Sequence, residues 1–244
     1  PAQPAKPADA PAGSAEDKVP QQLDRVVITG TTSLKRTVRE SSVAVTVADR
    51  ETLDRKAPRS TASALELVPG IFVEDSGGEV SNNFSVRGLA GGAQSFIQLQ
   101  EDGLPVFYTN ALADTILKQE LFIDRMEAVR GGTSGILTVN GAGATINFIT
   151  FKNKDEPEGA IRFTTSDYNT KRVDFRYGGA LGDRWFGGLG GFYRSSDSVR
   201  DTGFTADHGG LVRGYLGRKI DGGEFSVNFK LVDDHNTFLL PIPL

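Results

Sequence analysis

Strict alternation of apolar and polar residues is the feature that most limits what the last third of this chain can fold into. It runs through residues 161–166, 172–177 and 224–231, where aliphatic or aromatic side chains alternate with polar or charged ones. Successive side chains of a β-strand point to opposite faces of a sheet, so each segment predicts a strand with one apolar and one polar face. A half-exposed antiparallel sheet of a soluble protein shows this pattern, and so does a transmembrane β-barrel.

The lengths of the connections between these strands favour the barrel. From residue 158 onward the expected connections are 166–170, 182–184, 195–207 and 218–223, and we expect the second and fourth to be the short ones. Outer-membrane barrels have the same asymmetry, with short periplasmic turns and longer extracellular loops. We therefore expect about five antiparallel barrel strands, too few to close a barrel, so the sequence is expected to be truncated.

The segment before residue 152 predicts a small α+β unit with a mixed sheet and short helices. Asp49 and Ser60 are suited to cap helices that run through Leu53 and Leu67, because their side-chain oxygens can accept hydrogen bonds from free backbone N–H groups. Extended runs are expected at 43–47, 71–73, 84–87, 96–99 and 145–150, a hairpin turn at 101–103, and a helical turn near 120–125.

The first 23 residues are rich in proline and alanine and predict a flexible tail, because they can bury too little apolar surface to fold. The tail leads into an extended run, Val26–Gly30, whose β-branched residues favour a strand. The N-terminus has neither the basic nor the apolar region of an export signal, so we expect any such signal to have been removed.

Composition and motif spacing exclude several classes of function. The chain has no cysteine and only two histidines, which leaves no thiolate site and too few histidines for a histidine-rich metal site. Its net charge of −4 does not suggest a nucleic-acid-binding protein. Ser134 is no elbow nucleophile, because Ile136 stands where that motif requires glycine, and the glycines of 140–145 lead into a strand instead of a phosphate-binding helix. We expect no catalytic residue, no metal site and no cofactor.

Five motifs resemble the plug domain of TonB-dependent outer-membrane receptors. They are Leu65–Ile71, Phe84–Gly88, Leu99–Val106, Ile123–Gly131 and Asn140–Thr150. Each motif alone is weak, but together they follow the order and approximate spacing found in this family, and the resemblance spans about residues 24–150.

In this family a globular plug fills a 22-stranded transmembrane β-barrel. The resemblance therefore implies a periplasmic tail over 1–23, a TonB-box segment over 24–30, a plug domain over 31–152 and the first about five barrel strands over 153–244. It also implies a protein that is not an enzyme.

The resemblance places the TonB-binding segment at Val26, Val27, Ile28, Thr29 and Gly30. An extended segment on a flexible tail can add as a strand to the sheet edge of a partner. The alternative is that this run is simply the first strand of the plug.

Arg87 and Arg130 each lie in a Val-Arg-Gly sequence and match the arginines that, in this family, lock the plug against barrel glutamates. The glutamates are expected in strands beyond this sequence. Gly88 and Gly131 would allow a sharp turn beside each arginine. Gly132 stands where the family usually has proline, which leaves that turn less rigid.

Substrate contacts in the family come from the apical loops of the plug and from the barrel interior. The corresponding candidates are Asn82, Asn83, Gln94, Phe107, Tyr108 and Asn110. The two aromatic residues could stack on a sugar or an aromatic siderophore, or they could pack against the barrel wall.

The function implied by the resemblance is TonB-dependent import of a scarce bulky nutrient, such as ferric siderophore, cobalamin or oligosaccharide, across the outer membrane of a Gram-negative bacterium. The implied partners are TonB with ExbB and ExbD, outer-membrane lipid, and a small-molecule or oligosaccharide substrate, but no nucleic acid. The plug and the N-terminus would face the periplasm. The alternative is a soluble surface or periplasmic ligand-binding module with a plug-like fold, which would have no reason to maintain an apolar outer face over five strands.

Overall fold

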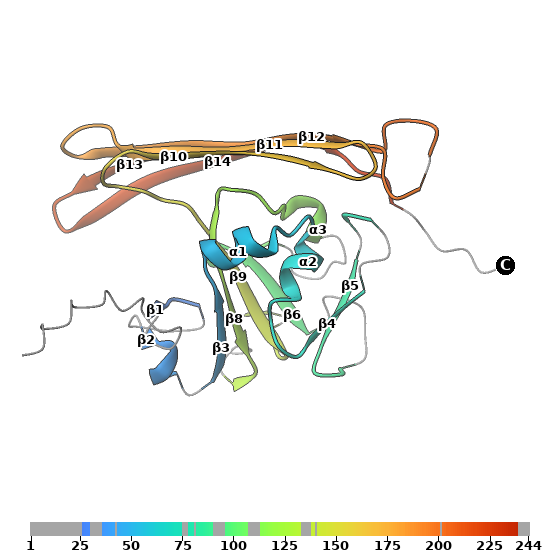
Figure 1. Ribbon diagram of the computed structural model, residues 1–244. Coiled ribbons are helices and arrows are strands. Elements are labelled where there is room, and N and C mark those ends of the chain that lie inside the picture. Colours follow the sequence, from blue (N-terminus) through green and yellow to red (C-terminus); the bar gives the residue numbers. More distant parts are fainter. Residues whose placement is uncertain are drawn as a thin grey trace, which may run out of the picture.

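The computed structural model describes two sheet-based parts of the chain, which we call the inner unit and the curved sheet (Figure 1). The inner unit comprises the described residues up to Thr150, and the curved sheet comprises the strands between Glu158 and His235. The described residues are 26–29, 36–41, 43–74, 78–80, 82–89, 96–106, 113–132, 138–139, 141–200 and 202–238.

A five-stranded mixed sheet forms the centre of the inner unit, with the strand order β3-β8-β9-β6-β7. Its strands are β3 (Ala44–Ala48), β6 (Ile97–Glu101), β7 (Leu104–Pro105), β8 (Ile123–Arg130) and β9 (Ala144–Thr150). Strands β6 and β9 are parallel, and the other neighbours are antiparallel. All seven residues of β9 are buried, so both faces of the sheet are covered at its centre.

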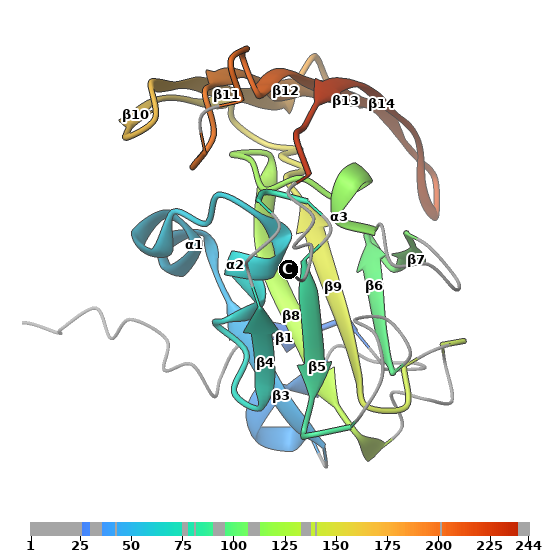
Figure 2. The ribbon, with the colours of Figure 1, turned by 90° about the vertical axis from the view of Figure 1, so that its right-hand side faces the viewer.

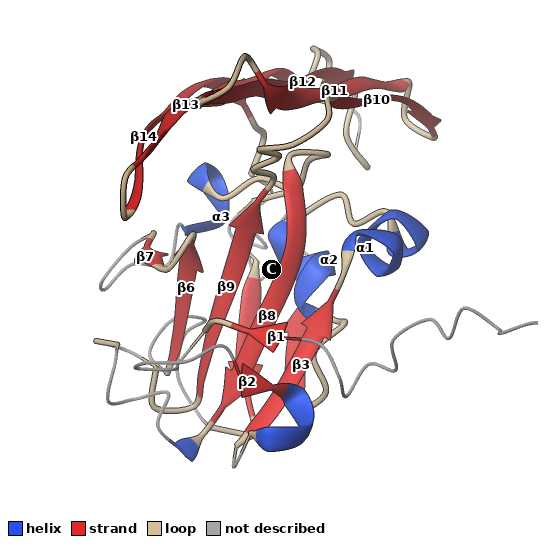
Figure 3. Cartoon of the chain, turned by 90° about the vertical axis from the view of Figure 1, so that its left-hand side faces the viewer, coloured by secondary structure: helices blue, strands red, loops and turns tan. Residues whose placement is uncertain are grey.

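Two small strand pairs flank this sheet. They are β1 (Val26–Val27) with β2 (Arg36–Thr37), and β4 (Ile71–Glu74) with β5 (Asn83–Val86). Figure 3 views the inner unit from the side on which β1 and β2 lie.

Short helices complete the inner unit: η2 (Val38–Glu40), α1 (Arg50–Lys56), α2 (Thr61–Leu65) and α3 (Ala113–Ile116). The two expected caps are confirmed, because Asp49 accepts a hydrogen bond from Thr52 N at 2.9 Å and Ser60 accepts one from Ser63 N at 3.0 Å. In the described part of the chain, no helix has the length and apolar character needed to cross a membrane.

The curved sheet has five antiparallel strands in sequence order: β10 (Glu158–Ser166), β11 (Thr170–Ala180), β12 (Trp185–Ser196), β13 (Asp207–Ile220) and β14 (Gly223–His235). Figure 2 shows it arching over one end of the inner unit. The expected order of connection lengths is only partly correct. The loop 197–206 is long and the turn 221–222 is short, but the connection 167–169 is also short. The difference in length between the connections at the two ends of the curved sheet therefore comes from the single loop 197–206.

The two faces of the curved sheet differ as the alternation predicts. The outer face carries large apolar and aromatic side chains that expose between 44% and 79% of their surface: Ile161, Phe163, Tyr177, Trp185, Leu189, Tyr193, Leu216, Phe225, Val227, Phe229 and Leu231. The inner face carries charged and aromatic side chains that contact the inner unit.

An aromatic cluster joins the two parts. Phe122 of the inner unit meets Phe151 edge-on, with 5.8 Å between ring centroids, and lies 6.1 Å from the ring of Tyr215 in β13. A Cβ atom at Gly190 of β12 would collide with the ring of Phe122, so the missing side chain makes the space that this ring occupies. The contact therefore depends on a glycine in the curved sheet.

The expectation of a helical turn near 120–125 is only partly correct. Ile123 N donates to Glu120 O at 3.1 Å, which closes one turn, but β8 already begins at Ile123. The residues from Leu117 to Phe122 are instead buried. Their backbone finds a partner across the interface, since Arg172 of β11 donates from Nη2 to the carbonyl oxygen of Gln119 at 2.5 Å. Tertiary contact thus adds to the one local hydrogen bond of this turn.

Candidate functional site

The segment Val26–Thr29 is held against the inner unit by the carboxylate of Glu127 in β8. The backbone N–H groups of Ile28 and Thr29 donate to Oε2 at 3.0 and 2.9 Å, and the Thr29 hydroxyl donates to the same oxygen at 2.7 Å. Glu127 is fully buried, and Arg125 donates from Nε to its other oxygen at 3.0 Å. A buried charge requires such partners, so the segment is part of what makes this carboxylate stable in the interior.

The segment is extended and buries one side. Val27 and Thr29 are 2% and 4% exposed, whereas Val26 and Ile28 are each 43% exposed. Val26 and Val27 also pair with Thr37 and Arg36 of β2. The structure thus places four of the five residues of the expected TonB-binding segment, and Gly30 lies outside the described residues.

Asn147 of β9 connects this segment to a turn of the inner sheet. It lies opposite Glu127 in the β8–β9 register and is 2% exposed. Its Nδ2 donates to the Thr29 hydroxyl oxygen at 3.1 Å, and its Oδ1 accepts from Gly103 N at 2.9 Å. The Thr29 hydroxyl therefore both donates and accepts a hydrogen bond.

The two expected lock arginines lie together on the inner unit. Arg130 donates from Nη1 to Pro69 O at 2.5 Å and from Nη2 to Thr46 Oγ1 at 3.0 Å, and Arg87 donates weakly to Arg130 O at 3.5 Å. Burial, together with the positive charge of Arg87, lowers the pKa of Arg130. Within the part of the chain that the structure describes, neither guanidinium has an ion-pair partner.

The glycines that follow the two arginines have left-handed backbones. Gly88 has φ 71° and Gly131 has φ 70°, and Arg87 itself has φ 50°. These values produce the sharp turns expected beside both arginines.

A charged network lies between the inner unit and the curved sheet. Glu101 pairs with Arg213 of β13 at 2.7 Å and with Lys230 of β14 at 2.8 Å, and Arg213 Nε also lies 2.9 Å from Glu120 Oε1. Burial raises the pKa of Glu120 to about 7, although both cations oppose this rise. Burial acts in the same direction on Glu101, but Arg213 and Lys230 outweigh it and lower the pKa of that carboxyl.

Further ion pairs cross the same interface. Lys118 contacts Asp234 of β14 at 2.9 Å, and Asp54 of α1 contacts Arg162 of β10 at 3.1 Å. Most of these ion pairs join a carboxylate of the inner unit to a cation of the curved sheet. The pair of Lys118 with Asp234 has the opposite arrangement. None of them involves the two expected lock arginines.

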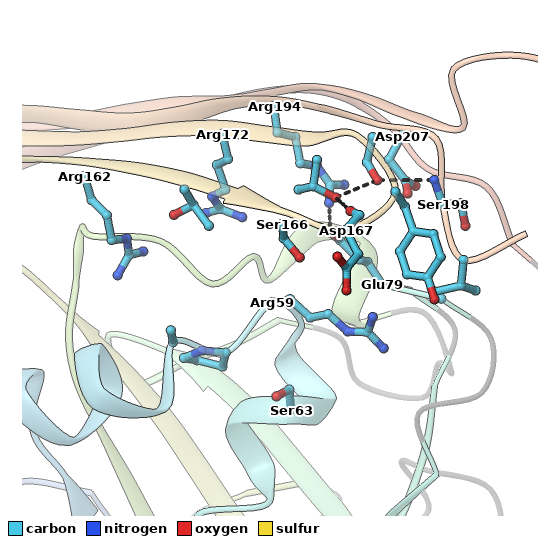
Figure 4. A pocket seen from close by; sticks show the side chains of 18 residues that line it. Arg59, Ser63, Glu79, Arg162, Ser166, Asp167, Arg172, Arg194, Ser198 and Asp207 are labelled. Atoms are coloured by element: carbon cyan, nitrogen blue, oxygen red, sulfur yellow. Dashed lines mark hydrogen bonds and ion pairs between the residues drawn. The ribbon is translucent and has the colours of Figure 1, made fainter.

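A cavity of about 480 Å³ lies between the two parts (Figure 4). Its polar lining includes Arg59, Ser63, Glu79, Arg162, Ser166, Asp167, Arg172, Arg194, Ser198 and Asp207. Several of these charges already have partners within the protein. Arg172 pairs with Asp174 at 2.7 Å, and Arg194 pairs with Asp234 at 3.1 Å and contacts Glu79. The lining offers hydrogen-bonding groups, but much of its charge is internally compensated.

The expected substrate residues are only partly described. Asn82 is 2% exposed, and its backbone N donates to Asp114 Oδ2 at 3.0 Å while its Nδ2 donates to Gly78 O at 3.0 Å. Asn83 is exposed in β5. The other candidates, Gln94, Phe107, Tyr108 and Asn110, lie outside the described residues, as does the tail 1–23. Among the residues that the structure describes, no three acidic or histidine side chains converge as a metal site would require.

Sequence reasoning missed the residues that hold the N-terminal segment and those that join the two parts. Glu127 stands between Met126 and Ala128 in a strand that is otherwise mostly apolar at its centre, and Asn147 stands between Ile146 and Phe148. A polar residue within such an apolar run is a usable signal, because burying it requires a specific partner.

Comparison with known proteins gives consistent matches. Residues 37–145 match the family model described as TonB-dependent Receptor Plug Domain. The ferrioxamine receptor of Yersinia enterocolitica is 25% identical over 173 residues, which are 70% of this chain and 24% of that receptor. The ferric-pyoverdine BN7/BN8 receptor of Pseudomonas putida is 32% identical over 152 residues, which are 62% of this chain and 18% of that receptor. This chain therefore spans a quarter or less of either relative.

Solved structures show the same fold. The pyoverdine outer membrane receptor of Pseudomonas aeruginosa superposes with a TM-score of 0.70 at 24% identity, over 87% of this chain and 31% of that one. The alcaligin outer membrane receptor of Bordetella pertussis gives 0.67 at 20% identity, over 86% of this chain and 35% of that one. The chain therefore carries the plug domain of the TonB-dependent receptor family, followed by five antiparallel strands that match the start of the family's barrel.

Proposed function

We propose that this chain is part of a receptor that imports a ferric siderophore across the outer membrane of a Gram-negative bacterium with energy supplied through TonB. Two of the relatives are a ferrioxamine receptor and a ferric-pyoverdine receptor, which favours a ferric siderophore over cobalamin or an oligosaccharide. TonB would act together with ExbB and ExbD.

The geometry of Val26–Thr29 is the observation that carries the TonB part of this proposal. The segment is extended, two of its side chains are about half exposed, and it follows a proline- and alanine-rich sequence. Strand addition to a partner uses main-chain hydrogen bonds and alternate side chains, which suits a segment of this kind. We assign the TonB-binding role to Val26, Val27, Ile28, Thr29 and Gly30.

The outer face of the curved sheet supports a membrane location. Phe163, Phe225 and Leu231 each expose at least 65% of their surface. Such an apolar face is costly in water and stable against lipid, which disfavours the soluble ligand-binding module. We therefore propose that lipid covers this face and that the plug and the N-terminal segment face the periplasm.

The pairing of Arg87 and Arg130 supports a lock role for them. Two positive charges held side by side, without a carboxylate in the described residues, favour binding of acidic side chains from elsewhere in the complete receptor. We assign that role to Arg87 and Arg130, with the turns at Gly88 and Gly131.

Titration of the chain with a purified TonB carboxy-terminal domain tests the TonB assignment. The parent chain should bind, and Ile28→Pro should weaken binding at least about tenfold, because proline lacks the backbone donor needed for strand addition. Ala10→Pro, outside the segment, should bind like the parent. Equal binding by the parent and Ile28→Pro, or no binding by a folded parent, would remove the TonB-binding assignment.

Uptake of radiolabelled iron by cells producing the complete receptor tests the substrate. Under iron limitation, a ferric hydroxamate or pyoverdine-type siderophore should enter in a TonB-dependent manner. Uptake of labelled cobalamin instead would contradict the siderophore assignment.

A further inference from the structure

The only two histidines of the chain lie side by side on the curved sheet. His208, near the start of β13, and His235, the last residue of β14, are direct partners in the antiparallel register. Their rings are stacked, with 4.6 Å between the ring centroids and 2° between the ring planes. Opposed residues on one face of a sheet are close enough for their side chains to act together. The pairing of β13 with β14 therefore holds the two imidazoles as a pair.

The pair is accessible from water on the outer face of the curved sheet. Both side chains are exposed. Phe229 and Leu231 lie on the outer face of β14, so the alternation of side chains also places Asp233 and His235 there. Beyond Leu231 these outer positions are polar, and the long loop 197–206 leads into β13 at the same end of the sheet. A water-soluble ion can therefore reach the two rings beyond the apolar part of this face.

The cavity between the inner unit and the curved sheet is a separate site. Asp207 is buried and lines that cavity, whereas its neighbour His208 is exposed on the opposite face of β13. The histidine pair therefore does not share its ligands with the cavity.

The geometry of the two rings suits a shared metal ion. Imidazole nitrogen is the commonest protein ligand of transition metals. Zinc binds such a nitrogen at 2.0–2.1 Å, so two nitrogens on one ion are at most about 4 Å apart. Stacked rings with centroids 4.6 Å apart need only a small tilt to bring one nitrogen of each within this limit. Both side chains are exposed, so this tilt does not require repacking of the interior.

A nearby carboxylate favours a cation over an anion at this position. Asp233 Oδ1 lies 3.7 Å from His235 Nδ1, and the Asp233 side chain is 95% exposed. A carboxylate that faces one ring nitrogen leaves the other nitrogen, here Nε2, to bind a metal. Within the described residues no group of three acidic or histidine side chains converges on one point, so the two imidazoles are the protein ligands and water completes the coordination.

We propose that His208 and His235 form an exchangeable binding site for one divalent transition-metal ion. Imidazole ligands suit Cu²⁺, Zn²⁺ and Ni²⁺, with Cu²⁺ bound most tightly, whereas Ca²⁺ and Mg²⁺ prefer oxygen ligands. Asp233 is a positioning residue that acts through His235. The site goes beyond the proposed import of a siderophore and does not depend on it.

Calorimetric titration of the chain with Zn²⁺ in detergent micelles tests the site. The parent should bind one ion per chain, and Cu²⁺ should bind more tightly than Zn²⁺. His208→Asn and His235→Asn should each weaken Zn²⁺ binding at least about tenfold, because either change leaves a single imidazole. The double variant should bind no more weakly than either single variant. Ca²⁺ and inorganic phosphate should give no binding heat at the same concentrations.

A matched control keeps two exposed histidines but separates them. Asp221 lies in the turn at the other end of β13 and is 96% exposed at its side chain, so His235→Asn combined with Asp221→His leaves the histidine count unchanged. This control should bind Zn²⁺ as weakly as His235→Asn alone. Zn²⁺ should raise the urea midpoint of the parent, followed by Trp185 fluorescence, and leave that of the control unchanged.

Several results would overturn the site. They are no Zn²⁺ binding by the folded parent, equal affinities of the parent and His235→Asn, and a separated-histidine control that binds as tightly as the parent. Asp233→Asn should weaken Zn²⁺ binding by a smaller factor than either histidine variant, with the same urea midpoint as the parent in metal-free buffer. An unchanged Zn²⁺ affinity in this variant would overturn the positioning role of Asp233.

Discussion

Replacing Glu120 by glutamine should stabilise the chain near pH 8, although it removes one member of the charged network. Burial raises the pKa of this carboxyl to about 7. Arg213 Nε lies 2.9 Å from one carboxylate oxygen, but within the described residues neither oxygen accepts a hydrogen bond. The ionised form is therefore less well accommodated in the folded protein than in the unfolded chain.

The size of the effect follows from linkage. Because the folded-state pKa of Glu120 is raised, its contribution to stability is fully present below the ordinary value of 4.5 and is lost as the pH rises through about 7. Each pKa unit corresponds to about 1.4 kcal/mol, so the contribution lost at high pH is at most about 3.5 kcal/mol. Glu120→Gln should match the parent near pH 4 and exceed its free energy of unfolding by up to about 3.5 kcal/mol near pH 8.

Urea titration in detergent micelles between pH 4 and 9 measures this difference. The single tryptophan, Trp185 in β12, provides a fluorescence signal from the curved sheet. Glu101→Gln is the matched control, because the net lowering of the Glu101 pKa by Arg213 and Lys230 predicts the opposite sign, a loss of stability near pH 8. If Glu120→Gln also lowered stability near pH 8, the assignment of burial as the dominant effect on Glu120 would be refuted.

Three further substitutions test the packing. Phe122→Ala should lower the free energy of unfolding by about 3–5 kcal/mol in the same titration, whereas Phe72→Ala, at a residue 71% exposed, should change it by less than about 0.5 kcal/mol. Asp102→Ala should lower the free energy of unfolding by about 1–3 kcal/mol, because it removes the acceptor of the Thr150 backbone N–H. Asp102→Asn keeps an acceptor and should lower it less. Equal losses for the two variants would contradict this role of Asp102. Leu189→Lys, on the outer face, should lower stability in lipid bilayers by about 2–4 kcal/mol; no loss in folding assays on vesicles would contradict a lipid-facing position.

Local patterns in the sequence predicted much of the fold. The alternation of residues 224–231 predicted the two faces of β14. The capping side chains of Asp49 and Ser60 predicted where two helices begin. These features depend on neighbours in the sequence. The match of residues 37–145 to the plug domain of TonB-dependent receptors agrees with the expectation that the chain is not an enzyme.

Features that depend on distant contacts were not predicted. A helical turn was expected near 120–125, but the residues before β8 form one turn whose carbonyl groups are held by distant side chains, Arg50 at Leu121 O and Arg172 at Gln119 O. The partner of Glu127 lies 98 residues away at Thr29, so no local pattern could identify it. The roles assigned to the candidate TonB-binding, lock and substrate residues, and the domain boundaries, stay predictions.

The ring of Phe122 over Gly190 also limits how the inner unit can move along the curved sheet. On the inner face of β12, the next position in one direction carries the side chain of Phe192, and in the other direction the ring of Tyr215 covers Gly188. A slide by two residues, about 7 Å, would drive the Phe122 ring into one of these aromatic side chains. The ring therefore opposes sliding of the inner unit along β12, and a motion that keeps the contact between Phe122 and Gly190 costs less free energy. Rearrangement would then start at the other end of the inner unit, where the N-terminal segment is held by hydrogen bonds.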